Sequence, residues 1–189
     1  SSAASDVYKR QQYGGATALS DWNTLYNFIM TNSMANATNY DNVISQYDAT
    51  SLVDYVFTNG VTVCSDWLNY NTGWWRGMDT TGTHRRWGYI LWDNDATFGH
   101  YINYTGIPNT GPTADPCDVE QITSNNDPEA HIDIFMALYA NPQFKALYVN
   151  RYADLLNTSL SCDYMNALLD SMINTIAPEM ARHCTRWGR

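Results

Sequence analysis

The chain has 189 residues, enough for one domain with a sizeable core or for part of a larger one. Ten Lys and Arg against 19 Asp and Glu give a formal net charge of −9, which argues against nucleic acid as a partner. Phosphate backbones are bound by surfaces rich in Lys and Arg. No apolar run approaches the ~20 residues that a membrane-spanning helix needs. The polar residues are chiefly Asn, Thr, Ser and Tyr, a bias that we associate with exported proteins.

Residues 1–11 read SSAASDVYKRQ and resemble, at every position, the in-frame translation of a sequencing-library adaptor. We therefore expect this segment to be foreign to the gene and exclude it from the fold, as one excludes a tag. It follows that Lys9 has no function and that the coding sequence continues upstream of Gln12. The folded part is expected to be 12–189.

Periodic apolar residues predict a first helix over about 20–32, with Ser20 as its N-cap. The Gly-rich segment 12–19 before it is expected to be a linker, and the Asn-rich segment 32–42 after it a loop.

A second helix is predicted to begin near Asp48. Its apolar face is formed by Leu52, Val53, Val56 and Phe57. Gly60 is expected to interrupt this helix, because glycine is a poor helix former.

Aromatic and β-branched residues predict two short strands, Trp74–Met78 and Arg86–Asp93, joined by a polar turn that contains Gly82. Residues i and i+2 of a strand share a face. Asp93 and Asp95 would therefore point the same way if the strand geometry persists that far. Helices and one strand pair together predict an α+β fold that is mainly helical.

The segment 106–126 has no periodicity, and three helices are predicted after it. Each begins at a typical N-terminal signal: Asp127-Pro128, Asn141-Pro142 and Ser161. Pro178 is expected to break or kink the last of them. The three amphipathic helices are expected to form a bundle against which the strand pair packs.

Four cysteines occur at positions 64, 117, 162 and 184, and none forms a Cys-x-x-Cys pair, so their spacing does not indicate a zinc site. Either one or two disulfides form or the thiols are buried. The four histidines are scattered and are expected to be structural or at the surface. Only His100 lies close enough to Asp93 and Asp95 in the sequence to be considered a ligand.

Asp66, Asn71, Asp93 and Asp95 form the candidate site. Asp66 and Asn71 have the spacing Asp-x-x-x-x-Asn, and Asp93 follows after a hydrophobic strand, which is the order used by protein kinases. There the first Asp orients the substrate hydroxyl or accepts its proton, and the Asn and the later Asp hold the metal that bridges the phosphates. Mg²⁺ is commonly bound by one or two carboxylates plus substrate oxygens. The alternative is that these residues only cap turns and end a strand.

Three segments resemble the CotH kinase family, which is named for a spore-coat protein H. They read SDWLNYNTGWWRG, RRWGYILWDNDATFGHYINYTGIP and NPQFKALYVNRYADLLNTSL…APEMARHCTRWG. The resemblance extends from about Gln12 to the end of the chain. It implies the C-terminal lobe of a protein-kinase-like fold, with a β-hairpin that carries the metal-site Asp residues.

The same resemblance implies an atypical protein kinase, extracellular or at the cell surface, that transfers phosphate from ATP to Ser or Thr of secreted or coat proteins. Its cofactor would be Mg²⁺ or Mn²⁺. Asp66 matches the catalytic aspartate, Asn71 the metal-binding asparagine and Asp93 the metal-binding aspartate of the Asp-Phe-Gly position. Asp95 matches a second acidic residue of the metal and nucleotide site. The loop 106–126 takes the place of an activation segment.

A kinase also needs a smaller lobe with a Lys that grips the phosphates. Lys occurs only at positions 9 and 145, so we expect this chain alone to have little or no phosphotransfer activity. Two alternatives stay open. One is a catalytically inactive, kinase-like module for surface adhesion or structure, since a fold does not fix a function. The other is a calcium-stabilised extracellular domain rich in Asp and Asn.

Overall fold

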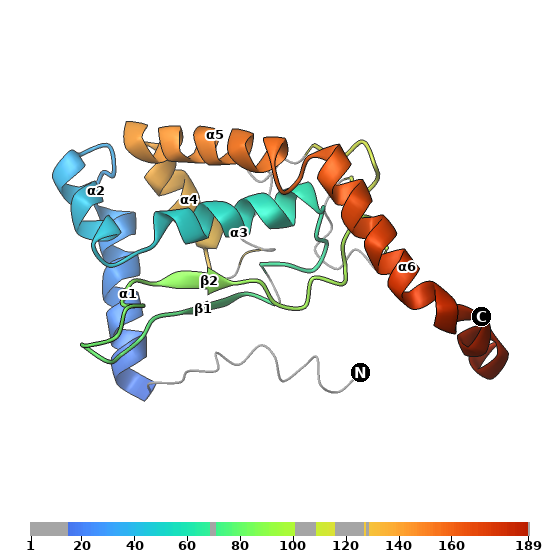
Figure 1. Cartoon of the computed structure of the whole chain (residues 1–189). Helices are drawn as coiled ribbons and strands as arrows, with labels where there is room; N and C mark the ends of the chain where they lie inside the picture. The colour runs from blue at the N-terminus through green and yellow to red at the C-terminus, as the bar shows by residue number, and fades with distance from the viewer. Residues whose placement is uncertain (1–14, 69–70, 101–108, 116–126, 128, 189) are drawn as a thin grey trace. The chain divides into compact units, whose positions relative to one another are not determined.

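The computed structural model describes residues 15–68, 71–100, 109–115, 127 and 129–188. The chain divides into unit 1, Ser1–Tyr148, and unit 2, Val149–Arg189. The described residues are mainly helical with one two-stranded antiparallel sheet, which agrees with the predicted α+β class. The elements (Figure 1) are α1 (Gly15–Thr31), α2 (Ala37–Ile44), α3 (Ala49–Val61), β1 (Gly73–Trp75), β2 (Gly88–Ile90), α4 (His131–Tyr139), α5 (Pro142–Asn157) and α6 (Cys162–Trp187).

Helix α1 begins at Gly15, well before the predicted start, so Ser20 lies inside the helix and is not its N-cap. The predicted linker 12–19 is therefore wrong for 15–19, while 12–14 lies outside the described residues. Ala18 is buried and extends the apolar stripe of the helix. Because Ala and Leu are strong helix formers, this stretch joins the helix despite the glycine that starts it.

Helix α2 occupies part of the predicted loop 32–42. The side chain of Asn36 accepts hydrogen bonds from the backbone N–H groups of Thr38 and Asn39, so it caps the helix N-terminus. Tyr40 and Val43 are buried. The Asn-rich composition concealed a helix because one of its asparagines is the cap.

Helix α3 confirms the prediction at Asp48, whose side chain accepts a hydrogen bond from Ser51 N. Its predicted apolar face is buried, and further buried residues, Tyr55 and Asn59 among them, join it. Gly60 does not interrupt the helix. The cost of a helical glycine, about 1 kcal/mol relative to alanine, is outweighed by this burial.

Strands β1 and β2 pair with Trp74 opposite Tyr89, and both are shorter than predicted. The strand geometry ends at Ile90, and Asp93 adopts a left-handed φ of 54°. The expectation that Asp93 and Asp95 share a strand face is therefore wrong, because the backbone turns before it reaches them.

The hairpin packs against α3 (Figure 1), a helix that the predicted packing on the C-terminal helices did not include. The approach is close because β2 has a glycine at the contact. A Cβ on Gly88 would lie 3.1 Å from Ser51 Oγ, and the same hydroxyl accepts a hydrogen bond from Tyr89 N at 2.8 Å.

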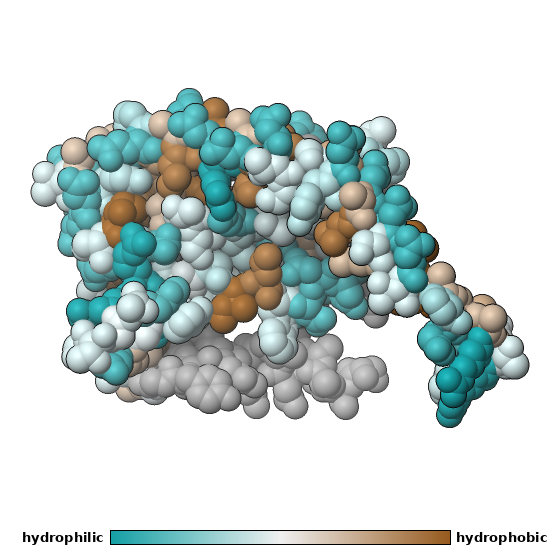
Figure 2. Space-filling model, viewed as in Figure 1, coloured by the Kyte–Doolittle hydropathy of each residue, from teal (hydrophilic) through white to brown (hydrophobic). Residues whose placement is uncertain are grey.

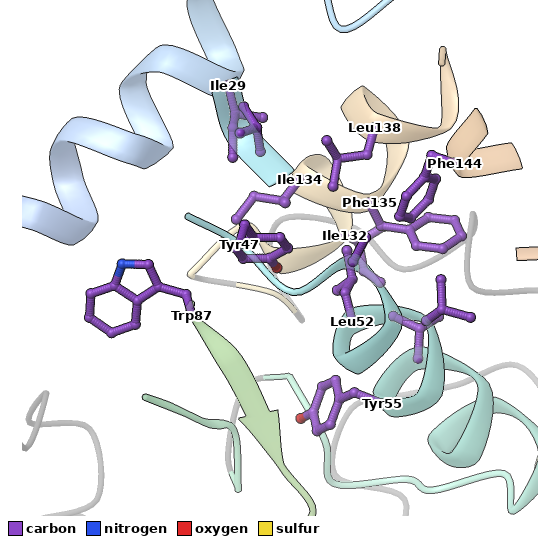
Figure 3. Packing of buried hydrophobic residues seen from close by; sticks show 14 of the residues in the cluster. Ile29, Tyr47, Leu52, Tyr55, Trp87, Ile132, Ile134, Phe135, Leu138 and Phe144 are labelled. Atoms are coloured by element: carbon purple, nitrogen blue, oxygen red, sulfur yellow. The ribbon is translucent and has the colours of Figure 1, made fainter. Parts of the chain in front are cut away.

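The core of unit 1 contains residues from α1, α3, α4 and the segments beside the hairpin (Figure 3). A polar chain crosses it, in which Tyr89 Oη lies 2.7 Å from Tyr47 Oη and 2.7 Å from His131 Nδ1. His131 also meets the Trp74 ring edge-on at 4.6 Å. These bonds satisfy polar groups that would otherwise be costly to bury.

Two of the three predicted starts of the C-terminal helices are correct. The prediction that Asp127 caps a helix starting at residue 128 is wrong, because α4 begins at His131 after Ala130. Asp127 Oδ2 nevertheless accepts a hydrogen bond from Ile132 N at 2.7 Å. Asn141 and Ser161 cap α5 and α6 as predicted. Pro178 does not break α6, which continues to Trp187. Proline removes one helical hydrogen bond, and the residues around it are exposed, so water can satisfy the freed carbonyl.

Among the described cysteines, Cys64 is a buried thiol, and Cys162 and Cys184 are exposed thiols. Of these three, only Cys64 fits the alternative of buried thiols, and none of the three is in a disulfide. Cys117 lies outside the described residues. On the face shown in Figure 2, hydrophilic and weakly polar residues predominate, as the Asn- and Thr-rich composition leads one to expect.

Candidate functional site

The candidate site begins where α3 ends. Val63 adopts a left-handed φ of 50°, and Cys64 N donates a hydrogen bond to Asn59 O at 2.9 Å, which turns the chain back toward the helix. All residues from Cys64 to Leu68 are buried. Asp66 is among them, with only 8% of its surface exposed. A buried carboxyl within a loop is uncommon unless it is hydrogen-bonded or functional.

Two segments distant in sequence lie side by side at this place. Ser65 N donates to Ala96 O at 2.8 Å, and Phe98 N donates to Thr62 O at 2.8 Å. Ser65 Oγ adds a third bond to Ala96 O at 3.2 Å. These bonds bring the segment that contains Asp66 beside the turn that contains Asp95.

The Asp66 carboxylate accepts a hydrogen bond at each oxygen. Asn71 Nδ2 donates to Oδ2 at 3.0 Å, and Cys64 Sγ donates to Oδ1 at 3.5 Å. Asn71 has a left-handed φ of 55°, a strained conformation for a residue other than glycine. The amide nitrogen of Asn71 donates to Asp66, so only the carbonyl oxygen of this side chain could ligate a cation.

Burial raises the pKa of the Asp66 carboxyl above its ordinary value. The hydrogen bonds from Cys64 and Asn71 lower this pKa in part, whereas the negative charges of Asp95 and Asp93 raise it. Asp93 and Asp95 are therefore close enough to act electrostatically on the Asp66 carboxyl. Burial also raises the pKa of the Cys64 thiol to about 11.

The four predicted residues flank the hairpin and do not lie in its strands. Asp66 and Asn71 precede β1, and Asp93 and Asp95 follow β2. Since Gly73 pairs with Ile90, both sets are at the same open end of the hairpin. Asp66 is buried, Asn71 is half-buried, and Asp93 and Asp95 are exposed.

Within the described part of the chain, no three His, Cys, Asp or Glu side chains lie close enough to form a metal-binding group. His100 is exposed on the loop after the turn and joins no such group. The donors that do meet here, carboxylate and amide oxygens, are those that Mg²⁺ prefers. Mg²⁺ commonly takes one or two carboxylates and completes its shell with water and phosphate oxygens. The residues present fit such an ion by their chemistry.

A separate pocket of about 430 Å³ lies between α3 and β2. Its lining includes Asp48, Ser51, Asp54, Tyr55 and Tyr89, and it contains none of the four candidate residues. The four candidate residues therefore lie outside this pocket.

Sequence reasoning missed three residues of the site: Asn59, Cys64 and Asn94. Asn94 Nδ2 donates to Asn59 Oδ1 at 2.9 Å and to Cys64 Sγ at 3.8 Å. No local pattern marks them, because their contacts span about 30 residues of sequence or more. The one available signal was the position of Asn94 between two aspartates.

The family profile described as CotH kinase protein matches residues 1–189, the whole chain. No curated protein and no solved structure matched. No helix in the described segments is both long enough and apolar enough to cross a membrane. With the family profile covering every position, the chain belongs to the CotH kinase protein family.

Proposed function

We propose that the chain is part of a kinase-like phosphotransferase that uses ATP and a divalent metal, Mg²⁺ or Mn²⁺. Family membership supports kinase-like chemistry in general. One observation in the fold supports this particular site. The bonds between Ser65 and Ala96 bring Asp66 near the turn of Asp93 and Asp95, although Asp66 and Asp93 lie 27 positions apart along the chain.

In this proposal Asp66 orients the acceptor hydroxyl of a protein substrate or accepts its proton. A carboxylate with a raised pKa is the stronger proton acceptor, and burial raises that of Asp66. Asn71 and Cys64 hold the carboxylate in one orientation through their hydrogen bonds. The substrate hydroxyl would approach from the open end of the hairpin.

Asn71, Asp93 and Asp95 would hold the metal through oxygen atoms, with the phosphates of ATP completing its ligands. When bound, the metal neutralises the charge that develops on the transferred phosphoryl group. Asp93 and Asp95 are exposed, so they can accept such a ligand without a rearrangement of the core.

We further propose that 12–189 is the larger lobe of a kinase-like fold, that 1–11 is foreign to it, and that the protein acts on secreted or surface proteins outside the cell. The only Lys beyond residue 9 is Lys145, which lies in α5 with its Nζ 5.1 Å from the centre of the Tyr139 ring. It contacts an aromatic ring and not the candidate site. A phosphate-gripping Lys would then come from a segment upstream of Gln12.

The test is transfer of labelled phosphate from ATP to protein in a chain extended upstream of Gln12. Asp66→Asn is expected to lower turnover by about 10²–10⁴-fold, the usual contribution of a general base. Asp93→Ala should also abolish transfer. Because Asp93 is exposed, this loss would not be explained by misfolding. Asp41→Asn, an exposed change on α2, is the matched control. Unchanged autophosphorylation in Asp93→Ala would refute the role given to Asp93.

An inactive, kinase-like adhesion or structural module is the second candidate. It is favoured by the composition, which includes 14 Tyr and 7 Trp, and by the fact that a fold does not fix a function. This candidate predicts that the extended chain neither transfers phosphate nor binds ATP with Mg²⁺. A calcium-stabilised domain, in contrast, predicts stabilisation by Ca²⁺ alone.

A further inference from the structure

Asn94 separates the two exposed aspartates of the candidate site, yet its own side chain is turned toward the protein. Its amide nitrogen donates to Asn59 Oδ1 at 2.9 Å and to Cys64 Sγ at 3.8 Å. The residue is half-buried, whereas Asp93 and Asp95 on either side are exposed. The turn is therefore attached to the protein interior through its central residue.

Asn59, the first partner, is held rigidly in α3. It is 1% exposed, and its Nδ2 donates to Tyr55 O at 2.9 Å. A backbone carbonyl can only accept a hydrogen bond, so the nitrogen of the Asn59 amide must face it. The carbonyl oxygen of the same amide then faces Asn94. This oxygen can only accept a hydrogen bond, so the amide nitrogen of Asn94 must donate it. The hydrogen bonding fixes the orientation of both amides.

Cys64, the second partner, connects Asn94 to Asp66. The thiol is 2% exposed and donates to Asp66 Oδ1 at 3.5 Å, so the sulfur lone pairs are left for Asn94. Burial raises the pKa of the thiol to about 11, which keeps it a protonated donor at neutral pH. Asn94 is thus linked to Asp66 through a single sulfur atom.

We propose that Asn94 is a positioning residue, whose amide, held by Asn59 and Cys64, sets the spacing between Asp66 and the two carboxylates of Asp93 and Asp95. The inference rests on the proposed function, because it assigns a role toward the metal that this function requires. The backbone gives independent support. Asp93 has a left-handed φ of 54°, and such strained residues persist only where surrounding contacts hold them.

The experiment is a titration of the chain with Mn²⁺ in the presence of ADP, followed by tryptophan fluorescence. Trp92 is 65% exposed and adjoins Asp93, so it reports directly on the turn. The variants are Asn94→Ala, Asn59→Ala and the double variant, with Asn42→Ala, an exposed asparagine of α2, as the matched control. Asn59→Ala leaves the sequence of the turn intact, so it keeps the test decisive if Asn94→Ala is unfolded.

We expect each single variant to raise the half-saturating Mn²⁺ concentration by about 10–100-fold, the usual effect of losing a contact behind a metal ligand. The half-saturating Mn²⁺ concentration of the double variant should not exceed that of the weaker-binding single variant, because the two residues act through one contact. Melting temperatures identify folded variants. A merely structural role would lower the melting temperature without this shared shift in half-saturation.

Two results would overturn the inference, and they differ. If neither the unsubstituted chain nor a chain extended upstream of Gln12 shows a Mn²⁺-dependent change with ADP, the proposed function fails and the positioning role with it. If the unsubstituted chain titrates and folded Asn94→Ala titrates at the same concentration, only the positioning role fails. Additive shifts in the double variant would likewise show that Asn59 and Asn94 do not act as one unit.

Discussion

Helices α3 and α6 have the same kind of sequence and different surroundings. Both are amphipathic, and both begin at a side chain that caps the helix, Asp48 in α3 and Ser161 in α6. Yet seven residues of α3 are buried, and α6, twice as long with 26 residues, has none in the buried class.

The two helices show that the signals that form a helix differ from the contacts that bury it. Capping and periodicity are local and act in both units. Burial needs a partner, and α3 has one in β2. All four candidate site residues follow α3 and lie in unit 1. The candidate site is therefore in the same unit as the buried helix and comes after it in the sequence. Functional residues need such support, because small displacements of a catalytic group are costly.

The largest contrast is expected from matched Leu→Ala changes in the two helices. Leu52 in α3 is 0% exposed, and Leu169 in α6 is 54% exposed. Leu52→Ala should lower the free energy of unfolding by about 2–5 kcal/mol, the usual cost of a cavity in a packed core. Leu169→Ala should change it by less than about 0.5 kcal/mol. Urea denaturation of both variants measures these changes. Equal losses of unfolding free energy would show that α6 is covered by a partner in solution.

Thiol reactivity should distinguish the same two regions. Cys64 in unit 1 is buried with its pKa raised to about 11 from 9.0, so its thiolate is scarcer by about two orders of magnitude. Cys162 and Cys184 in α6 are exposed. We expect fast modification of these two and slow modification of Cys64 at pH 7.5–8, about the usual range for thiol reagents. Mass spectrometry of digested samples, with and without urea, measures the rate of modification at each cysteine. Rapid modification of Cys64 in the folded chain would contradict its burial.

Removal of the N-caps of α3 and α6 should affect stability less than the core substitution, and the two caps should differ in their effect. Asp48→Ala removes the acceptor for Ser51 N and the ion pair with Arg86, and should cost about 1 kcal/mol in the unfolding of unit 1. Asp48→Asn keeps the cap and loses the ion pair, so it is the control. Ser161→Ala should lower helicity in far-UV circular dichroism without moving that transition, because α6 has no buried residue. A shift of the unit 1 transition in Ser161→Ala would show that the two units unfold together.

The smallest expected effect concerns the cost of burying Asp66. Its folded pKa lies above the ordinary value of 3.8, so the folded state binds the proton more tightly than the unfolded state. Stability is therefore lost as pH rises from about 4 through the folded pKa. Asp66→Asn lacks this titration, and its melting temperature should rise relative to the unsubstituted chain over that interval and stay higher at neutral pH.

The measurement for Asp66→Asn is a series of melting temperatures from acid to neutral pH, with EDTA present to exclude bound metal. Asp170→Asn, an exposed change in α6, is the matched control and should show no such trend. A difference between Asp66→Asn and the unsubstituted chain that does not vary with pH would contradict the account of the Asp66 pKa.

The sequence predicts the helices that begin at strong caps, because capping is a contact within one turn. Asp48, Asn141 and Ser161 were all identified in this way. It misplaces α1 and misses α2, where Gly15 and the many asparagines suggested loop. In both cases a buried apolar stripe outweighed local propensity, and such burial depends on partners elsewhere in the chain.

The candidate site divides along the same line. The order of Asp66, Asn71 and Asp93 can be read directly from the sequence. The left-handed turn at Asp93 and the contacts of Asn94 cannot, because they depend on the bonds between 62–65 and 96–98. Prediction by strand alternation failed at Asp93 because the chain leaves the sheet at Ile90.

The most direct test of the proposed cation and nucleotide site is the melting temperature of the chain extended upstream of Gln12, measured with ADP, with Mg²⁺, with both, and with Ca²⁺ alone. A ligand that binds only the folded state raises this temperature. We predict a rise that requires ADP and Mg²⁺ together and that disappears in Asp93→Asn. No rise with both ligands, or a rise that Asp93→Asn leaves unchanged, would contradict the assignment of this site, and a rise with Ca²⁺ alone would favour a calcium-stabilised domain.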